Sequence, residues 1–263
     1  MVVTHQPPSA PSHLTLHTYE EKIEGYDRLE AWGSSPAVKK WSPLPFDLPE
    51  GIREMASKAF AFTHSPNLPG ARLLMTADEL RDFLKTCHYP AVLKTCFGLA
   101  GRGKWILNQA SDLKAEVFEE FKKGDGIIGE PWVDRDFDFS TQWIIGDEIQ
   151  FLGATCLINT PDGHYNKTLL NRPIPRLEEH LEIAKYPLKM IQERGYRGNV
   201  GIDAFIYEGK LHPICEINLR KTMGWLALTL NRNICYESGE EGPLPRYLNV
   251  GKKISFHKQL KLL

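Results

Sequence analysis

Two carboxylates, Asp203 and Glu216, are spaced in the sequence so that they can act on one ligand. They lie in two apolar stretches separated by Gly209-Lys210. A two-residue loop with glycine at its first central position suits a type II′ turn, so we expect a β-hairpin here. Counted outward from this loop, the strands pair Asp203 with Glu216. Gly201 then faces Asn218, and side-chain alternation places Asn218 on the same face as Asp203.

This pairing predicts a metal site. Directly opposed residues of antiparallel strands have Cβ atoms only about 4.5–5.5 Å apart, so two ionised carboxylates repel each other unless a cation lies between them. Two carboxylates and the Asn218 amide offer oxygen ligands, which select Mg²⁺ or Mn²⁺ over zinc. The alternative is an exposed hairpin with unrelated acids. Apolar neighbours on both faces argue against that alternative, namely Ile202, Phe205, Ile206, Ile214 and Ile217.

A second segment with chemical potential is the glycine-rich loop of residues 98–103, which Lys104 follows. It nearly matches the P-loop, but Trp105 replaces the Ser or Thr that would hold Mg²⁺, and residues 105–107 predict a strand where a P-loop needs a helix. A strand–loop–strand hairpin can still cover phosphates with its backbone N–H groups. Lys94, before the loop, is placed to touch them as a point charge. A plain glycine-rich turn is the alternative.

Composition excludes several function classes. The 263 residues carry 32 Lys+Arg against 33 Asp+Glu, a net charge of −1, which argues against nucleic acid or an anionic membrane as partner. No apolar run approaches the ~18 residues of a membrane span, and residues 1–12 lack the features of a secretory signal. The five cysteines are scattered without a C-x-x-C pair, unlike a disulfide framework or a zinc site. We expect a soluble, cytoplasmic protein.

The expected elements alternate without the βαβ repeat of a doubly wound sheet. Helices are expected over residues 50–63, 76–87, 111–124, 177–194 (with a kink or break at Pro187) and 222–230. Strands are expected over residues 90–94, 105–107, 127–133, 141–145, 148–158, 200–207 and 211–219. Hairpin spacing between several strands predicts an α+β fold with mainly antiparallel sheets. We expect an irregular, Pro-rich arm over residues 1–45 with one short helix near 19–31, a small lobe over 46–130 and a large lobe over 131–263, with a solvated tail from 252 to 263.

The sequence has a glycine-loop hairpin followed by an Asp…Glu-x-Asn-x-Arg hairpin. In this order, the two motifs resemble those of the ATP-grasp superfamily of ADP-forming carboxylate–amine or thiol ligases. Its members include D-alanine–D-alanine ligase and peptide ligases. The resemblance covers about residues 50–235. Lys58 in Ala56-Ser57-Lys58 resembles the family's helix lysine, and Lys94 with the glycine loop resembles its lysine-and-loop segment. Residues 129–133 resemble the hinge strand, whose Glu (Glu130) takes the adenine amino group while the following backbone completes adenine recognition.

The resemblance implies that ATP binds between the two lobes and that two ions, Mg²⁺ or Mn²⁺, bind Asp203, Glu216 and Asn218. It implies catalytic roles for Arg220, near the transferred phosphate, and for Lys94. Asp138 would hold the ribose where the family usually has Glu, and Asp136 is the alternative. The expected nucleotide-binding residues are Lys58, Lys94, Gly98, Gly101, Arg102, Gly103, Glu130, Trp132, Val133, Asp138, Lys167 and Arg172.

The implied reaction needs no protein nucleophile. A substrate carboxylate takes the γ-phosphate as an acyl phosphate, and an amine of amino-acid or peptide type then displaces phosphate. An ATP-grasp kinase acting on a small-molecule hydroxyl is one alternative, and a nucleotide-binding regulatory protein that needs a partner lobe is another. The family normally begins with a Rossmann-like lobe, where this sequence has its Pro-rich arm. We therefore expect either a homodimer or a partner protein to complete the site.

Overall fold

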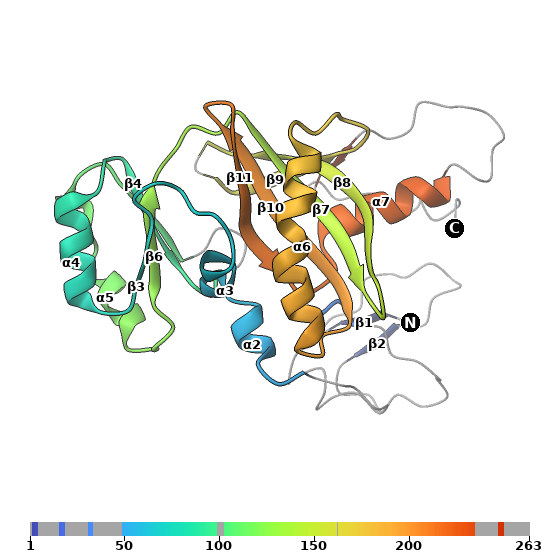
Figure 1. Cartoon of the computed structure of the whole chain (residues 1–263), viewed down its shortest axis with the longest axis horizontal. Helices are drawn as coiled ribbons and strands as arrows, with labels where there is room; N and C mark the ends of the chain where they lie inside the picture. Colours follow the sequence, from blue (N-terminus) through green and yellow to red (C-terminus); the bar gives the residue numbers. More distant parts are fainter. Residues whose placement is uncertain are drawn as a thin grey trace.

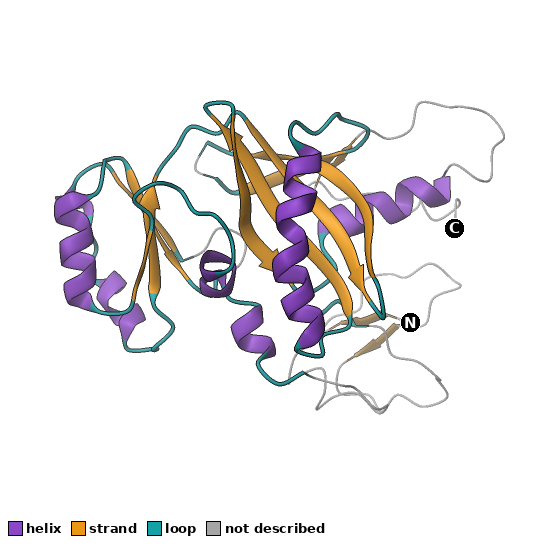
Figure 2. Cartoon of the chain, in the orientation of Figure 1, coloured by secondary structure: helices purple, strands orange, loops and turns teal. Residues whose placement is uncertain are grey.

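Two antiparallel sheets form the framework of the protein (Figures 1 and 2). The structure is a computed structural model; it describes residues 31–33, 49–98, 103–161 and 163–230, and the backbone alone of 2–4, 16–18, 231–234 and 247–249. The smaller sheet has the spatial order β3 (Arg72–Leu74), β6 (Ile127–Pro131), β4 (Ala91–Thr95) and β5 (Lys104–Leu107). The larger sheet has the order β11 (Lys210–Asn218), β10 (Gly198–Tyr207), β7 (Phe137–Ile145), β8 (Ile149–Asn159), β9 (Tyr165–Leu169) and β12 (Tyr247–Asn249). Separately, β1 (Val2–Thr4) and β2 (Leu16–Thr18) form a parallel pair. The expected α+β class with mainly antiparallel sheets is confirmed.

The smaller sheet buries one face against α4 (Ala77–Thr86) and α5 (Glu116–Phe121). Helix α4 begins at the expected capping box, because the Glu79 N–H donates to Thr76 Oγ1 at 3.2 Å and the Thr76 N–H donates to Glu79 Oε2 at 3.0 Å. Leu80 and Phe83 of this helix pack with Leu93 of β4 in one buried cluster. The packing holds in place the two central strands, which carry Lys94 (β4) and Glu130 (β6).

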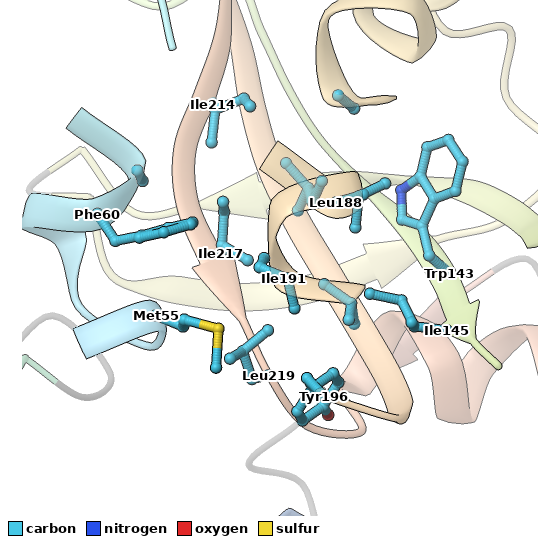
Figure 3. Close-up of a cluster of buried hydrophobic side chains, with 14 residues drawn as sticks. Met55, Phe60, Trp143, Ile145, Leu188, Ile191, Tyr196, Ile214, Ile217 and Leu219 are labelled. Atoms are coloured by element: carbon cyan, nitrogen blue, oxygen red, sulfur yellow. The ribbon is translucent and has the colours of Figure 1, made fainter. Parts of the chain in front are cut away.

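Helix α6 (Leu177–Glu193) lies across the larger sheet in Figure 2. Figure 3 shows the buried cluster between them, in which Leu188 and Ile191 of α6 pack with Ile214 and Ile217 of β11. Pro187 lies inside α6 and does not split it, because the helix runs on as 17 residues. Proline removes one helical hydrogen bond, but buried side chains before and after it hold both halves on the sheet.

Some expected helices are divided or shorter. Residues 50–63 form two helices, α2 (Ile52–Met55) and α3 (Lys58–Thr63), because Ser57 is extended and caps α3 by accepting from the Phe60 N–H at 3.1 Å. Residues 111–124 give a 3-10 turn, η1 (Ala110–Asp112), and α5. Helix α7 (Met223–Ile234) starts within one residue of its expected position. Strands β3, β9 and β12 were not predicted.

The hairpin of β10 and β11 has the expected pairing of Asp203 with Glu216 and of Gly201 with Asn218, although its loop lies elsewhere. The loop is Glu208-Gly209, with φ values of 47° and 67°, rather than the predicted Gly209-Lys210. Positive φ at both central residues is the signature of a type I′ turn, which fits the twist of a hairpin.

A bulge corrects the register between this loop and the acids. Phe205 pairs with His212, whereas Asp203 pairs with Glu216, so two steps along β10 correspond to four along β11. Pro213 lies in the bulge, where the absence of an N–H costs no ladder hydrogen bond. The loop error and the unexpected bulge cancel, and the acids meet as predicted.

The described residues contain no helix long and apolar enough to cross a membrane. The expected short helix near residues 19–31, apart from its last residue, and the tail from 252 to 263 lie outside the described residues. The division into lobes at residues 45 and 130 stays a prediction.

Candidate active site

A cavity of about 420 Å³ lies between the two sheets and collects most of the predicted site residues. The predicted residues that line it are Lys58, Lys94, Gly98, Gly103, Trp132, Asp138, Asp203, Glu216, Asn218 and Arg220. Those that do not line it are Glu130, Val133, Lys167 and Arg172. Gly101 and Arg102 lie outside the described residues.

On the small-lobe side, Lys94 of β4 forms a buried ion pair with Glu130 of β6. Burial, the largest single influence, would lower the pKa of Lys94, but the Glu130 carboxylate and, after it, the Cys215 side chain together raise the pKa. Lys94 therefore stays charged at the inner wall of the cavity. Glu130 touches the cavity only through this lysine.

Thr95, the next residue, anchors the base of the glycine loop. Its N–H donates to the Gly103 carbonyl at 2.8 Å, and a Cβ at Gly103 would lie 2.3 Å from Thr95 Oγ1, so glycine alone fits. Thr95 lines the cavity, and its hydroxyl is buried without a hydrogen-bond partner among the described residues. A buried, unpaired hydroxyl is costly, so the position suits a ligand that accepts a hydrogen bond.

Lys58, the first residue of α3, connects three features that the sequence suggested separately. Its Nζ lies 3.0 Å from Glu216 Oε1 and donates to the Gly98 carbonyl at 3.3 Å. The cap at Ser57 fixes where α3 begins and therefore where this lysine points. A cation at the start of α3 thus reaches both the glycine loop and the carboxylate hairpin.

The carboxylate hairpin brings Asp203, Glu216 and Asn218 together as predicted. Asn218 Nδ2 donates to Asp203 Oδ2 at 3.2 Å, and Arg220 donates to Asn218 Oδ1 at 2.7 Å. Burial, and then the Glu216 charge, raise the pKa of Asp203 to about 6. Nowhere in the described ranges do three His, Cys, Asp or Glu side chains cluster, so the amide supplies the third group. Two adjacent, insufficiently compensated carboxylates with an amide oxygen fit Mg²⁺ or Mn²⁺.

A short N-terminal segment lies beside Arg220. Gly33 and Arg220 form an isolated antiparallel bridge, and the Lys221 N–H donates to the Trp32 carbonyl at 2.8 Å. A Cβ at Gly33 would lie 2.7 Å from Arg220 Cβ, so the close approach requires glycine. Residues 31–33 therefore support the backbone of the arginine, a contact that the sequence did not suggest.

The two candidate ribose carboxylates lie in different places. Asp138 lines the cavity and accepts from Arg135 at 2.8 Å. Asp136 instead accepts from the Gly209 N–H at 3.1 Å, at the hairpin loop. Of the two, the geometry favours Asp138 as the group that a ligand in the cavity can reach.

Sequence reasoning missed Arg135, whose guanidinium lines the cavity and stacks on the Phe205 ring at 4.0 Å. It lies in a charged loop without periodicity, which reads as solvated. Lys104 also lines the cavity, with Nζ 5.6 Å from the centre of the Trp132 ring. Its position directly after the last loop glycine is the signal that could have indicated it. At the hinge, the Trp132 N–H donates to the Pro90 carbonyl at 2.8 Å.

Comparison with known proteins identifies the fold. No protein-family profile matches the sequence. Over 137 residues the chain is 26% identical to the [butirosin acyl-carrier protein]–L-glutamate ligase of Niallia circulans, a match that covers 50% of this chain and 33% of that protein. The biotin carboxylase of Campylobacter jejuni has a TM-score of 0.55 at 18% identity, over 73% of this chain and 45% of that one. The N5-carboxyaminoimidazole synthetase of Staphylococcus aureus, complexed with ADP, has a TM-score of 0.52 at 20% identity, over 64% and 44%.

Both solved structures are ATP-grasp enzymes, and this chain has the ATP-grasp fold. The resemblance that the motifs carried is thereby confirmed at the level of the fold. The chain spans less than half the length of each of these proteins, namely 33, 45 and 44%.

Proposed function

We propose that the chain is an ADP-forming, Mg²⁺-dependent ligase that joins a carboxylate to an amine. The observation that carries the proposal is the arrangement of charge in one cavity, whose lining combines the cations Lys58 and Lys94 with the carboxylates Asp203 and Glu216. A triphosphate with its metal ions needs both signs of charge in one site. The ligase name of the Niallia circulans relative supports the same reaction class.

The nucleotide would lie with its base at the hinge and its phosphates toward the hairpin. Trp132 offers an aromatic wall for adenine, and Asp138 an acceptor for the ribose. Glu130 would act on the nucleotide through Lys94, with which it is paired. Lys94 and Lys58 would hold the phosphates. The unpaired Thr95 hydroxyl lies beside the same path.

Asp203, Glu216 and Asn218 would hold the metal. Bound Mg²⁺ supplies neutralisation of the β- and γ-phosphate charge and orients the γ-phosphate. Arg220, which is fixed through Asn218 and the segment 31–33, would stabilise the charge that develops on the transferred group.

The substrate carboxylate would attack the γ-phosphorus to give an acyl phosphate and ADP, and the amine would then displace phosphate. The hairpin of β4 and β5 would keep water from the acyl phosphate. The relative's name specifies glutamate and an acyl-carrier protein, so we propose amino-acid substrates, free or carrier-bound.

The test is ADP release in the presence of amino acids, peptides and carrier-bound acids, with mass analysis of the product. We expect an amide, and Glu216→Gln should lose the metal-dependent turnover. Glu208→Gln in the same hairpin is the matched control, because Glu208 is exposed and pairs only with Lys210 among the ion pairs of the described residues. A phosphate ester as product would establish the kinase alternative. Release only with a second protein would favour the partner-dependent alternative, and turnover without Glu216 would refute the metal assignment.

A further inference from the structure

A row of buried hydrogen bonds runs from the start of α7 toward Asp203. Thr222 Oγ1 donates to Gln142 Oε1 at 2.7 Å, and Gln142 Nε2 donates to Ser140 Oγ at 2.8 Å. Ser140 is the register partner of Asp203 across β7 and β10, which places its hydroxyl on the same face of the sheet as the Asp203 carboxylate. We call these three residues the Thr222–Gln142–Ser140 network.

Every bond of this network points the same way. A hydroxyl has a single proton and two lone pairs. Because the Ser140 oxygen accepts from Gln142 Nε2, its own proton remains available to the Asp203 carboxylate. Gln142 presents its amide nitrogen to Ser140 because its carbonyl is engaged by Thr222. The donors of the network are therefore all directed toward the Asp203 carboxylate. A metal-binding site must hold such a ligand in one orientation.

Two glycines make room for the glutamine. A Cβ at Gly224 would lie 2.7 Å from Gln142 Nε2, and a Cβ at Gly201 would lie 2.5 Å from Thr222 Cγ2 and 3.2 Å from Gln142 Oε1. Any other residue at either position would displace the network. The network thus occupies a fitted slot between β10 and α7.

The three side chains of the network are buried, and burying polar groups costs free energy that apolar side chains at these positions would not cost. Ser140, Gln142 and Thr222 are only 2, 1 and 8% exposed. Gln142 does not line the cavity, so it has no access to a ligand. A buried amide is tolerated only when it is hydrogen-bonded, and an apolar side chain would pack there at lower risk.

The same network reaches the other end of the site. The Thr222 hydroxyl accepts from the Trp225 N–H at 3.2 Å and so caps α7. The segment between Arg220 and α7 is therefore tied to β7, the strand that pairs with the Asp203 strand β10.

We infer that the Thr222–Gln142–Ser140 network positions Asp203 for metal binding, with Gln142 as a positioning residue that touches no ligand. The inference rests on the proposed function in one respect, namely that Asp203 binds the metal. Residues that orient a metal ligand typically contribute 10- to 100-fold in metal affinity, so we expect about a tenfold or greater effect.

The experiment is a Mn²⁺ titration in the presence of ADP, followed by electron paramagnetic resonance, on the full chain. Gln142→Met has nearly the same volume but cannot donate, and Thr222→Val removes the first donor. Both should weaken Mn²⁺ binding about tenfold, and Thr222→Ser should restore it. The matched control is Gln192→Met, another buried glutamine, whose side chain donates to the Gly146 and Asp147 carbonyls and not to the Thr222–Gln142–Ser140 network.

The outcomes separate the inference from the proposed function. If the wild-type chain binds Mn²⁺ and Asp203→Asn weakens it, but Gln142→Met and Thr222→Val do not, the network is structural only and the inference is wrong. If Asp203→Asn has no effect, the metal assignment itself fails. A loss of thermal stability in Gln142→Met that is matched by Gln192→Met, without a change in Mn²⁺ affinity, also counts against positioning.

Discussion

Lys58 Nζ lies 3.0 Å from Glu216 Oε1, so an ion pair joins two residues 158 positions apart in the sequence. In the proposed site the lysine holds phosphate and the carboxylate holds metal. Each ligand therefore has to displace one partner of this ion pair. Binding of a metal–nucleotide complex would exchange the partners, with metal replacing the ammonium at Glu216 and phosphate replacing the carboxylate at Lys58.

Lys58→Met should weaken ATP binding without weakening metal binding. A hydrogen bond to a charged group contributes about 1.5–3 kcal/mol, so we expect a loss of about 10- to 100-fold in ATP affinity by calorimetry. Mn²⁺ affinity should stay equal or rise, because Glu216 loses a competing cation. Lys85→Met, at an exposed position paired with Asp82, should change neither. Equal weakening of both ligands would indicate a structural role for Lys58.

The parts of the site that the sequence predicted are those set by local pattern. The alternation of β10 and β11 specifies which side chains share a face, and Asp203 meets Glu216 even though the loop was placed one residue too late. The bulge at Pro213 compensates for the error in the loop position, and no sequence pattern predicted this bulge. The glycine loop between two strands was also predictable, because glycine and β-propensity are local signals.

The remaining parts depend on contacts between distant segments. The contact of Lys58 with Glu216 follows from how α3 packs between the sheets, which no spacing encodes. Arg135 lies in a loop, and its role depends on the ring of Phe205 from another strand. The bridge of Gly33 to Arg220 joins two segments that are far apart in the sequence, and neither residue type signals it.

The buried pair of Lys94 and Glu130 should show strong coupling in stability. Removing one partner leaves an uncompensated buried charge, so Glu130→Leu and Lys94→Met should each cost about 3–5 kcal/mol in the free energy of unfolding. The double variant should lose far less than the sum, because two apolar side chains leave no buried charge. Urea unfolding of the four proteins measures the cycle. Additive losses would mean that the two charges do not compensate each other.

Asp203 should make the metal-free protein less stable as pH rises. Its pKa is raised to about 6 by burial and by Glu216, whereas an unfolded Asp titrates near 4, so the folded state binds the proton more tightly. Stability then falls between about pH 4 and pH 6, and the loss is complete above that window. Asp203→Asn removes this titration.

The melting temperature of Asp203→Asn should therefore match the wild type at pH 4 and exceed it at pH 7.5 by a few degrees, at about 2–4 °C per kcal/mol. The melting temperatures of the two proteins are measured at both pH values by calorimetry, with a chelator present. A wild-type protein that is the more stable of the two at pH 7.5 would contradict the raised pKa.

Gly33→Ala should impair turnover while leaving ATP binding intact. The new Cβ would lie 2.7 Å from Arg220 Cβ, so the arginine backbone must move. A displacement near 1 Å of a group that acts on the transferred phosphate can cost about 100-fold, so we expect a fall of about 10- to 100-fold in kcat of the ligase reaction. Lys58 and Lys94 are held by other elements, and ATP affinity should not change. Gly146→Ala is the control, because its Cβ would meet nothing closer than the Glu148 carbonyl at 3.8 Å. If Gly33→Ala retains full kcat, residues 31–33 do not position Arg220, and their contact with it is packing alone.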